Sequence, residues 1–202
     1  MIAEKNQKEN WEQIWYLFKK GNEEAFAKLY NFHIQTLYQY GSKLSSDRDT
    51  VNDAIQEVFI DLYLRHKEIT TTPEKLKYYL IFSLRHNIIR RLKGKRQTPY
   101  REIGEIYYFS PQYSFESQLI QSEEENEIRE KLNRVIGELP SKQKEALYLR
   151  FNESLEYGEI AKILEITVES VRKQVYRALK SIKEIVGDKG IVLFFLFSSK
   201  KN

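Results

Sequence analysis

The segment that most constrains the fold is Tyr157–Lys183, YGEIAKILEITVESVRKQVYRALKSIK, which predicts a short helix, a tight turn and a longer helix. In both predicted helices, apolar residues recur at three- and four-residue steps, as they do along one face of a helix. Thr167 stands where its hydroxyl can accept a free backbone N–H at the start of the second helix. The apolar faces consist of Tyr157, Ile160, Ala161 and Leu164 in the first helix, and Val168, Val171, Val175, Ala178 or Leu179, and Ile182 in the second.

The outward face of the second predicted helix is basic and includes Arg172, Lys173, Tyr176 and Arg177. An α-helix fits the major groove of DNA, where Arg and Lys side chains reach the acceptors of guanine. The pattern therefore predicts a helix-turn-helix whose second helix reads DNA. An amphipathic helix pair with solvated charges stays open as the alternative, and Glu165 occupies the position of the usual turn glycine.

Composition limits the class of protein. The chain has 202 residues, of which 31% are charged, and a formal net charge of +4. It has no cysteine, which excludes disulfides, thiolate metal sites and thiol catalysis. The N-terminus lacks the apolar core of a signal peptide, and the longest apolar run, Ile191–Phe197, is too short to span a bilayer. We expect a soluble, cytoplasmic protein.

The first half of the chain predicts four helices, at about residues 10–20, from Asn22, at about 50–66 and from Glu74. Gly41 and the polar residues after it indicate a turn. The third helix has an apolar side and an outward acidic stripe of Asp53, Gln56, Glu57 and Asp61. The fourth helix combines aromatic and basic residues, which suit stacking on unpaired bases and contact with phosphates. Its alternative is a core helix with a solvated basic end.

The segment Glu102–Glu127 has a different composition, with seven Glu and neither Lys nor Arg. It predicts a linker between two helical domains. We expect an all-α fold with domains at 1–97 and 126–187, an acidic flexible linker at 98–125, and an apolar tail at 188–202. The tail residues Gly190–Phe197 either contact another protein or pack onto their own domain.

No catalytic constellation is evident. The three histidines are scattered over separate predicted helices, without companion ligands at the spacing of a metal site. Neither a phosphate-binding glycine loop nor a nucleophile elbow occurs. We expect no catalytic residue, metal, cofactor or small-molecule substrate.

Five stretches, in this order and spacing, resemble bacterial RNA polymerase sigma factors of the extracytoplasmic-function group. The resemblance covers most of Trp11–Val186. The stretches are GNEEAFAKLY, DAIQEVFIDLY, LKYYLIFSLRHNIIRRLK, LPSKQKEALYLRF and the helix-turn-helix segment.

The resemblance implies a promoter-specificity factor with several partners. These are core RNA polymerase, through its β′ clamp helices and β flap, promoter DNA, and an anti-sigma protein. It also implies that the acidic linker enters polymerase channels. The implied polymerase-binding residues are Asp53, Gln56, Glu57, Phe59 and Leu62. Those for the minus-ten element are Tyr78, Tyr79, His86, Asn87, Arg90 and Arg91, and those for the minus-thirty-five element are Arg172, Lys173, Tyr176 and Arg177.

The chain departs from the family pattern at three points. Glu165 replaces the turn glycine, and Tyr79 stands where the family often has Trp. The family usually has an Arg-Asn pair, whereas here Arg85 is followed by His86, and Asn87 comes one position later. Either His86 or Asn87 takes the role of that asparagine. The rival interpretations are an autonomous helix-turn-helix regulator with an N-terminal sensor or dimerisation domain, and a purely structural helical adaptor.

Overall fold

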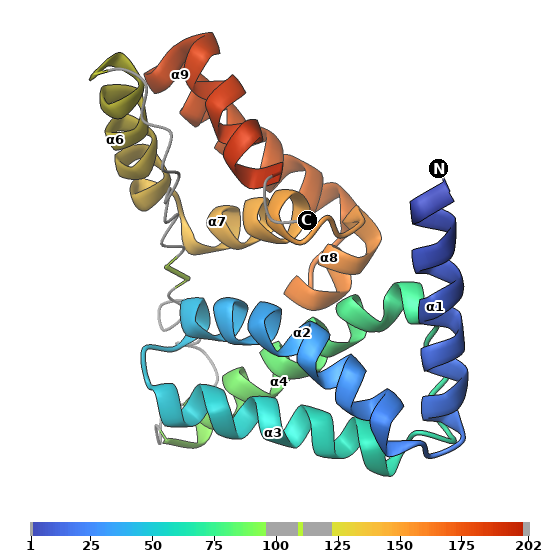
Figure 1. Cartoon of the computed structure of the whole chain (residues 1–202). Helices are drawn as coiled ribbons and strands as arrows, with labels where there is room; N and C mark the ends of the chain where they lie inside the picture. The colour runs from blue at the N-terminus through green and yellow to red at the C-terminus, as the bar shows by residue number, and fades with distance from the viewer. Residues whose placement is uncertain (1, 96–108, 111–122, 200–202) are drawn as a thin grey trace. The chain divides into compact units, whose positions relative to one another are not determined.

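The structure, a computed structural model, describes residues 2–95, 109–110 and 123–199, and the described residues contain helices and no strand (Figure 1). The chain divides into two compact units, Met1–Glu102 and Ile103–Asn202. The expected all-α fold is confirmed. Most of the predicted linker, 98–125, lies outside the described residues. Within that range, Phe109 is buried and its ring lies 5.8 Å from that of Tyr148.

The N-terminal unit is built around α2 (Glu23–Leu44), which packs against three other α-helices among the residues that the structure describes in this unit. These are α1 (Ile2–Lys19), α3 (Arg48–Leu64) and α4 (Leu76–Lys95), the last preceded by a 3-10 turn η1 (Pro73–Lys75). Helix α1 begins at Ile2, earlier than the sequence pattern predicts. The core of the unit includes Phe18, Leu29, Leu37, Tyr40, Leu62, Leu80 and Leu84.

Two short connections set the directions of α2 and α3. Gly21 has φ +83°, a left-handed conformation that glycine adopts without steric cost, and it ends α1 as predicted. The side chain of Asn22 then accepts a 2.8 Å hydrogen bond from the backbone N–H of Ala25. Asp47 caps α3 by accepting from the backbone N–H of Asp49 and, at 2.6 Å, from the hydroxyl of Thr50.

The predicted turn lies in the polar residues between Leu44 and Arg48, as expected, but it does not begin at Gly41, because α2 continues through this residue to Leu44. Gly41 is buried where α2 crosses α3 and α4. A Cβ there would lie 2.8 Å from Cγ1 of Val51 and 3.3 Å from Cδ1 of Ile88. The glycine therefore allows close packing of helices rather than ending one.

The C-terminal unit is built around α9 (Val168–Ser199), which packs against α6 (Glu123–Glu138), α7 (Ser141–Leu147) and α8 (Tyr157–Leu164). A π-helical turn, η3 (Tyr148–Asn152), follows α7 directly. The core of this unit includes Leu132, Ile136, Leu147, Leu149, Ile160, Ile163, Val171, Ala178 and Ile182.

The apolar tail packs onto its own unit. Gly187, with φ +67°, interrupts α9, and the segment after it returns as a further helical stretch (Figure 1). Phe194 on this stretch is fully buried, with its ring 5.7 Å from that of Phe151. The ring of Phe195 lies 5.2 Å from that of Phe151 as well. Of the two alternatives for the tail, the structure supports self-packing.

Candidate nucleic-acid interface

Helices α8 and α9 form the predicted helix-turn-helix, with a turn that is built without glycine. Glu165 takes the glycine position in the left-handed conformation, with φ 56° and ψ 43°. The backbone N–H of Ile166 donates to the carbonyl of Ala161 at 3.0 Å, which closes the end of α8. Left-handed backbone is unfavourable for a residue with a Cβ, so this turn carries local strain.

The cap predicted for the second helix is confirmed. The backbone N–H of Ser170 donates to the hydroxyl of Thr167 at 3.1 Å, and that hydroxyl donates to Oγ of Ser170 at 2.9 Å. Glu169 lies in the first turn, where the helix dipole favours a negative charge. The apolar face of the helix is buried through Val171, Val175, Ala178 and Ile182.

The opposite face of α9 exposes all four residues assigned to DNA reading: Arg172, Lys173, Tyr176 and Arg177. Lys173 forms a 2.6 Å ion pair with Glu169 one turn earlier, and both side chains are mostly exposed. Such an exposed pair is worth less than about 1 kcal/mol, so a phosphate can replace the carboxylate at small cost. The guanidinium of Arg172 lies 5.7 Å from the ring centre of Tyr157, on the neighbouring helix.

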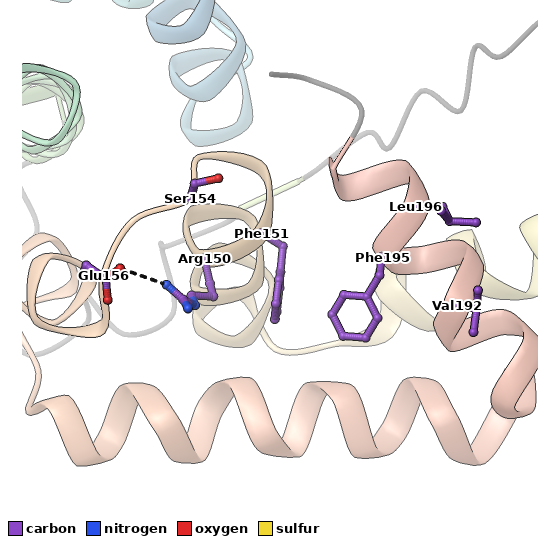
Figure 2. A pocket seen from close by; sticks show the side chains of 7 residues that line it. All are labelled: Arg150, Phe151, Ser154, Glu156, Val192, Phe195 and Leu196. Atoms are coloured by element: carbon purple, nitrogen blue, oxygen red, sulfur yellow. Dashed lines mark ion pairs between the residues drawn. The ribbon is translucent and has the colours of Figure 1, made fainter. Parts of the chain in front are cut away.

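Arg150 holds the loop that leads into α8. It donates to the carbonyl of Leu155 at 2.9 Å, lies 3.7 Å from the carboxylate of Glu156, and stacks 4.9 Å from the centre of the Tyr157 ring. Figure 2 shows the ion pair of Arg150 with Glu156, and Phe151 between Arg150 and Phe195 of the returning C-terminal stretch. Between them lies an open cleft of about 690 Å³, lined by Arg150, Phe151, Ser154, Glu156, Val192, Phe195 and Leu196.

Some of the residues assigned to polymerase binding on α3 are exposed and others are buried. Asp53 and Gln56 are exposed and Glu57 is half-buried, so these three share an outward face. Phe59 and Leu62 are buried and expose little surface, and their assignment as contact residues stays a prediction. The ring of Phe59 packs 4.6 Å from that of Tyr30 and 6.3 Å from that of Phe26, within the unit.

Two apolar residues that the sequence assignment missed are exposed on α3. Ile60 is 57% exposed and Leu64 is 72% exposed. They follow Gln56 at four-residue steps, so they extend its face along the helix. The signal was present in the sequence, because Ile60 and Leu64 fall outside the apolar positions that face the core.

The residues assigned to DNA binding on α4 also differ in their exposure. Tyr78 and Tyr79 are half-buried, and His86 is exposed. Phe82, which was not assigned, continues a row with Tyr78 and His86 at four-residue steps; its ring lies 6.1 Å from that of Tyr78 and 6.5 Å from that of His86. The even spacing of this row was the signal that could have identified it.

Asn87 is only 7% exposed, and Oδ1 of its side chain accepts a hydrogen bond from Arg90. His86, the preceding residue, is exposed. The side chain of Asn87 is thus used within the unit, and its assignment as a DNA contact stays a prediction.

Arg90 and Arg91 connect the faces of α3 and α4. Nη2 of Arg90 lies 2.6 Å from Oε1 of Glu57, and Nη2 of Arg91 lies 2.7 Å from Oε2 of the same carboxylate. Nη1 of Arg91 also lies 3.4 Å from Oδ2 of Asp53. The hydrogen bond from Arg91 is the largest cause that lowers the pKa of Glu57, burial opposes it, and the hydrogen bond from Arg90 adds to the lowering. Residues assigned to two different partners are thus bonded to each other.

Within the described ranges, no group of three or more His, Cys, Asp or Glu side chains is placed to hold a metal ion. No helix among the described residues is long and apolar enough to cross a membrane.

Comparisons with known proteins agree with this division into two units. Residues 29–98 match the family described as Sigma-70 region 2, and residues 129–182 match Sigma-70, region 4. The first match lies in the N-terminal unit and the second contains the helix-turn-helix.

Curated relatives match over most of their length. The chain is 26% identical to the ECF RNA polymerase sigma factor SigX of Bacillus subtilis over 165 residues, which are 80% of this chain and 84% of the relative. It is 24% identical to SigW and 23% identical to SigM of the same organism, with 84% and 78% of this chain covered and 93% of each relative.

Solved structures share the fold. CnrH, in complex with the cytosolic domain of CnrY, superposes with a TM-score of 0.52 at 16% identity, over 87% of this chain and 96% of that one. The sigma factor RpoE of Bartonella quintana, in complex with the anti-sigma factor NepR, gives 0.53 at 18% identity, over 81% and 97%. The ordered pair of sigma regions, the helix-turn-helix and these relatives show that the chain belongs to the sigma-70 family, as a promoter-specificity factor of the extracytoplasmic-function type.

Proposed function

We propose that this chain binds core RNA polymerase and directs it to promoter DNA, without catalysing a reaction of its own. One observation carries the proposal: sigma regions 2 and 4 occur in order, each in its own compact unit. Separate units suit recognition of two promoter elements by one chain. The proposal places the protein in the cytoplasm, with the polymerase.

The exposed face of α3 is proposed to bind the polymerase. It combines carboxylates at Asp53 and Glu57 with apolar side chains at Ile60 and Leu64. Exposed apolar residues beside charges are typical of interfaces, in which burial supplies affinity and the charges set orientation. A partner helix with basic and apolar residues along one side would complement this face.

Two other faces are proposed to bind DNA. On α9, Arg172, Lys173 and Arg177 project as a major-groove reader does, and each can reach a guanine edge or a phosphate. On α4, the row of Tyr78, Phe82 and His86 offers ring faces for unpaired bases. We propose the first for the upstream promoter element and the second for the melted strand.

We also propose that a protein inhibitor of the anti-sigma class binds this chain. The support is that two structural neighbours are complexes, one with the cytosolic domain of CnrY and one with the anti-sigma factor NepR. The autonomous-regulator interpretation is not favoured, because a repressor has no need of sigma region 2.

Gel filtration with purified core polymerase tests the proposal. The chain should co-elute with core, and the variant Asp53→Lys should elute separately while its helical circular dichroism is unchanged, since Asp53 is exposed. The rival function predicts instead a dimer that binds duplex DNA on paired half-sites without core. Elution apart from core, together with such dimeric DNA binding, would overturn the proposal.

A further inference from the structure

Glu57 occupies a special position among the charged residues of the N-terminal unit. Each oxygen of its carboxylate bonds a different arginine, Arg90 at 2.6 Å and Arg91 at 2.7 Å. Glu57 belongs to the face of α3 proposed for the polymerase, whereas both arginines belong to the helix proposed for DNA. The same carboxylate therefore lies at the boundary of two binding surfaces.

The two arginines are held with different strength. Arg91 is less exposed than Arg90 and bonds both Glu57 and Asp53. Arg90 bonds Glu57 and also donates to the buried Asn87, so its guanidinium is directed along the unit's own surface. Nη2 of Arg90 therefore has both of its N–H donors directed at oxygens of the protein, and a phosphate that binds this nitrogen must displace Glu57 or Asn87.

We propose that Glu57 restrains Arg90 and Arg91 in the free protein, and that basic side chains of the bound polymerase take over the carboxylate and release both arginines to DNA phosphates. The inference rests on the proposed function for its second step only. This exchange of ion-pair partners needs no large movement of the helices, because the side chains of Arg90 and Glu57 are 58% and 36% exposed. Binding of the two partners is then coupled, with each favouring the other.

The expected effect follows from counterion release. Each phosphate contact on single-stranded DNA steepens the dependence of log K on log salt concentration by about 0.7. Release of two arginines should therefore steepen this slope by about 1.4. At low salt the affinity for DNA should also rise at least about threefold, since two exposed ion pairs no longer compete with phosphate.

The test compares Glu57→Gln with Asp61→Asn in the full-length protein. Both substitutions remove one negative charge from α3 and keep the shape of the side chain, and Asp61 is exposed on the same helix. Fluorescence anisotropy measures binding of a labelled 20-nucleotide single strand of mixed sequence between 25 and 200 mM NaCl, without polymerase. Glu57→Gln should bind more tightly, with a steeper salt slope, and Asp61→Asn should match the wild type in slope.

A further pair of variants assigns the gain to the arginines. In the background of Arg90→Ala and Arg91→Ala, Glu57→Gln should produce no gain. Two results would show that the restraint does not exist. One is that Glu57→Gln and Asp61→Asn have the same DNA affinity and salt slope. The other is that Glu57→Gln still raises the DNA affinity when both arginines are alanine.

The exchange with polymerase is tested separately. With saturating core polymerase and a forked promoter probe, the wild type and Glu57→Gln should have the same salt slope, because Glu57 is already occupied by the partner. A difference that persists in the holoenzyme would overturn the exchange. Failure of the wild type to bind core would instead contradict the proposed function, and the polymerase-free comparison would still decide whether Glu57 restrains the arginines.

Discussion

Replacing Phe194 tests whether the returning C-terminal stretch is part of the folded unit. Phe194 is fully buried, and its ring lies 5.7 Å from that of Phe151 and 5.4 Å from that of Phe195. Truncation of a buried phenylalanine to alanine costs about 3–5 kcal/mol, from lost transfer energy and the cavity that remains. For a unit of about 100 residues this should lower the melting temperature by more than 10 °C.

The chain offers an internal control for this experiment. Its two tryptophans, Trp11 and Trp15, lie in the N-terminal unit, so tryptophan fluorescence follows the unfolding of that unit alone. Far-ultraviolet circular dichroism follows the helices of both units. Phe194→Ala should shift the second signal strongly and leave the tryptophan transition unchanged.

Leu196→Ala is the matched variant on the same stretch. Leu196 is exposed, and removal of an exposed side chain should change stability by less than about 0.5 kcal/mol. If Phe194→Ala melts within 2 °C of the wild type, the tail does not stabilise the unit, and the packing of Phe194 on Phe151 contributes little to its stability.

Three other predictions concern stability and binding. Burial, and to a smaller extent the charge of Lys77, lowers the pKa of His33 from 6.5 to about 4. The folded state therefore favours neutral His33, and the free energy of unfolding is highest above pH 6.5 and decreases as the pH falls toward 4. About 2 kcal/mol should disappear between pH 7.5 and 5, and urea titrations followed by tryptophan fluorescence should show His33→Leu to be less sensitive to pH. Glu165→Gly should raise the melting temperature of the C-terminal unit by a few degrees, because glycine adopts the left-handed conformation without strain. Lys162→Gly, within α8, should lower this melting temperature. The opposite order of melting temperatures would show that Glu165 is not strained. Leu64→Asp should weaken binding to core polymerase at least tenfold without changing the melting temperature, and Tyr16→Asp, at an exposed site on α1, should bind as the wild type does; equal affinities would remove Leu64 from the interface.

Local signals in the sequence predicted much of the fold. Helical periodicity located the helix-turn-helix, and the hydroxyl of Thr167 caps the second helix as expected. The role of Gly41 was predicted wrongly, because the sequence does not distinguish a glycine that ends a helix from one that lets two helices pack closely. Only the contact with Val51 on α3 shows that Gly41 is of the second kind. The start of α1 at Ile2 was missed since the apolar periodicity becomes clear only from Trp11.

The candidate sites were predicted by segment more reliably than by residue. The resemblance identified α3, but only the structure separates the buried Phe59 from the exposed Ile60, one position along the helix. The bonds of Glu57 to Arg90 and Arg91 join residues 33 and 34 positions apart. No periodicity within one helix reports a contact between two helices, so this pairing required the packing of α3 against α4.

Run-off transcription tests the central claim most directly. Purified core polymerase is supplied with fragments of the source genome, with and without this chain, and the 5′ ends of the transcripts are mapped. We expect transcripts from a small set of discrete start sites that depend on the chain. We also expect Arg172→Ala to relax the preference at one base pair upstream, a discrimination worth about 1–3 kcal/mol. Transcription that is unchanged by adding the chain, in a preparation whose core binds it, would show that the chain does not direct the polymerase to promoters.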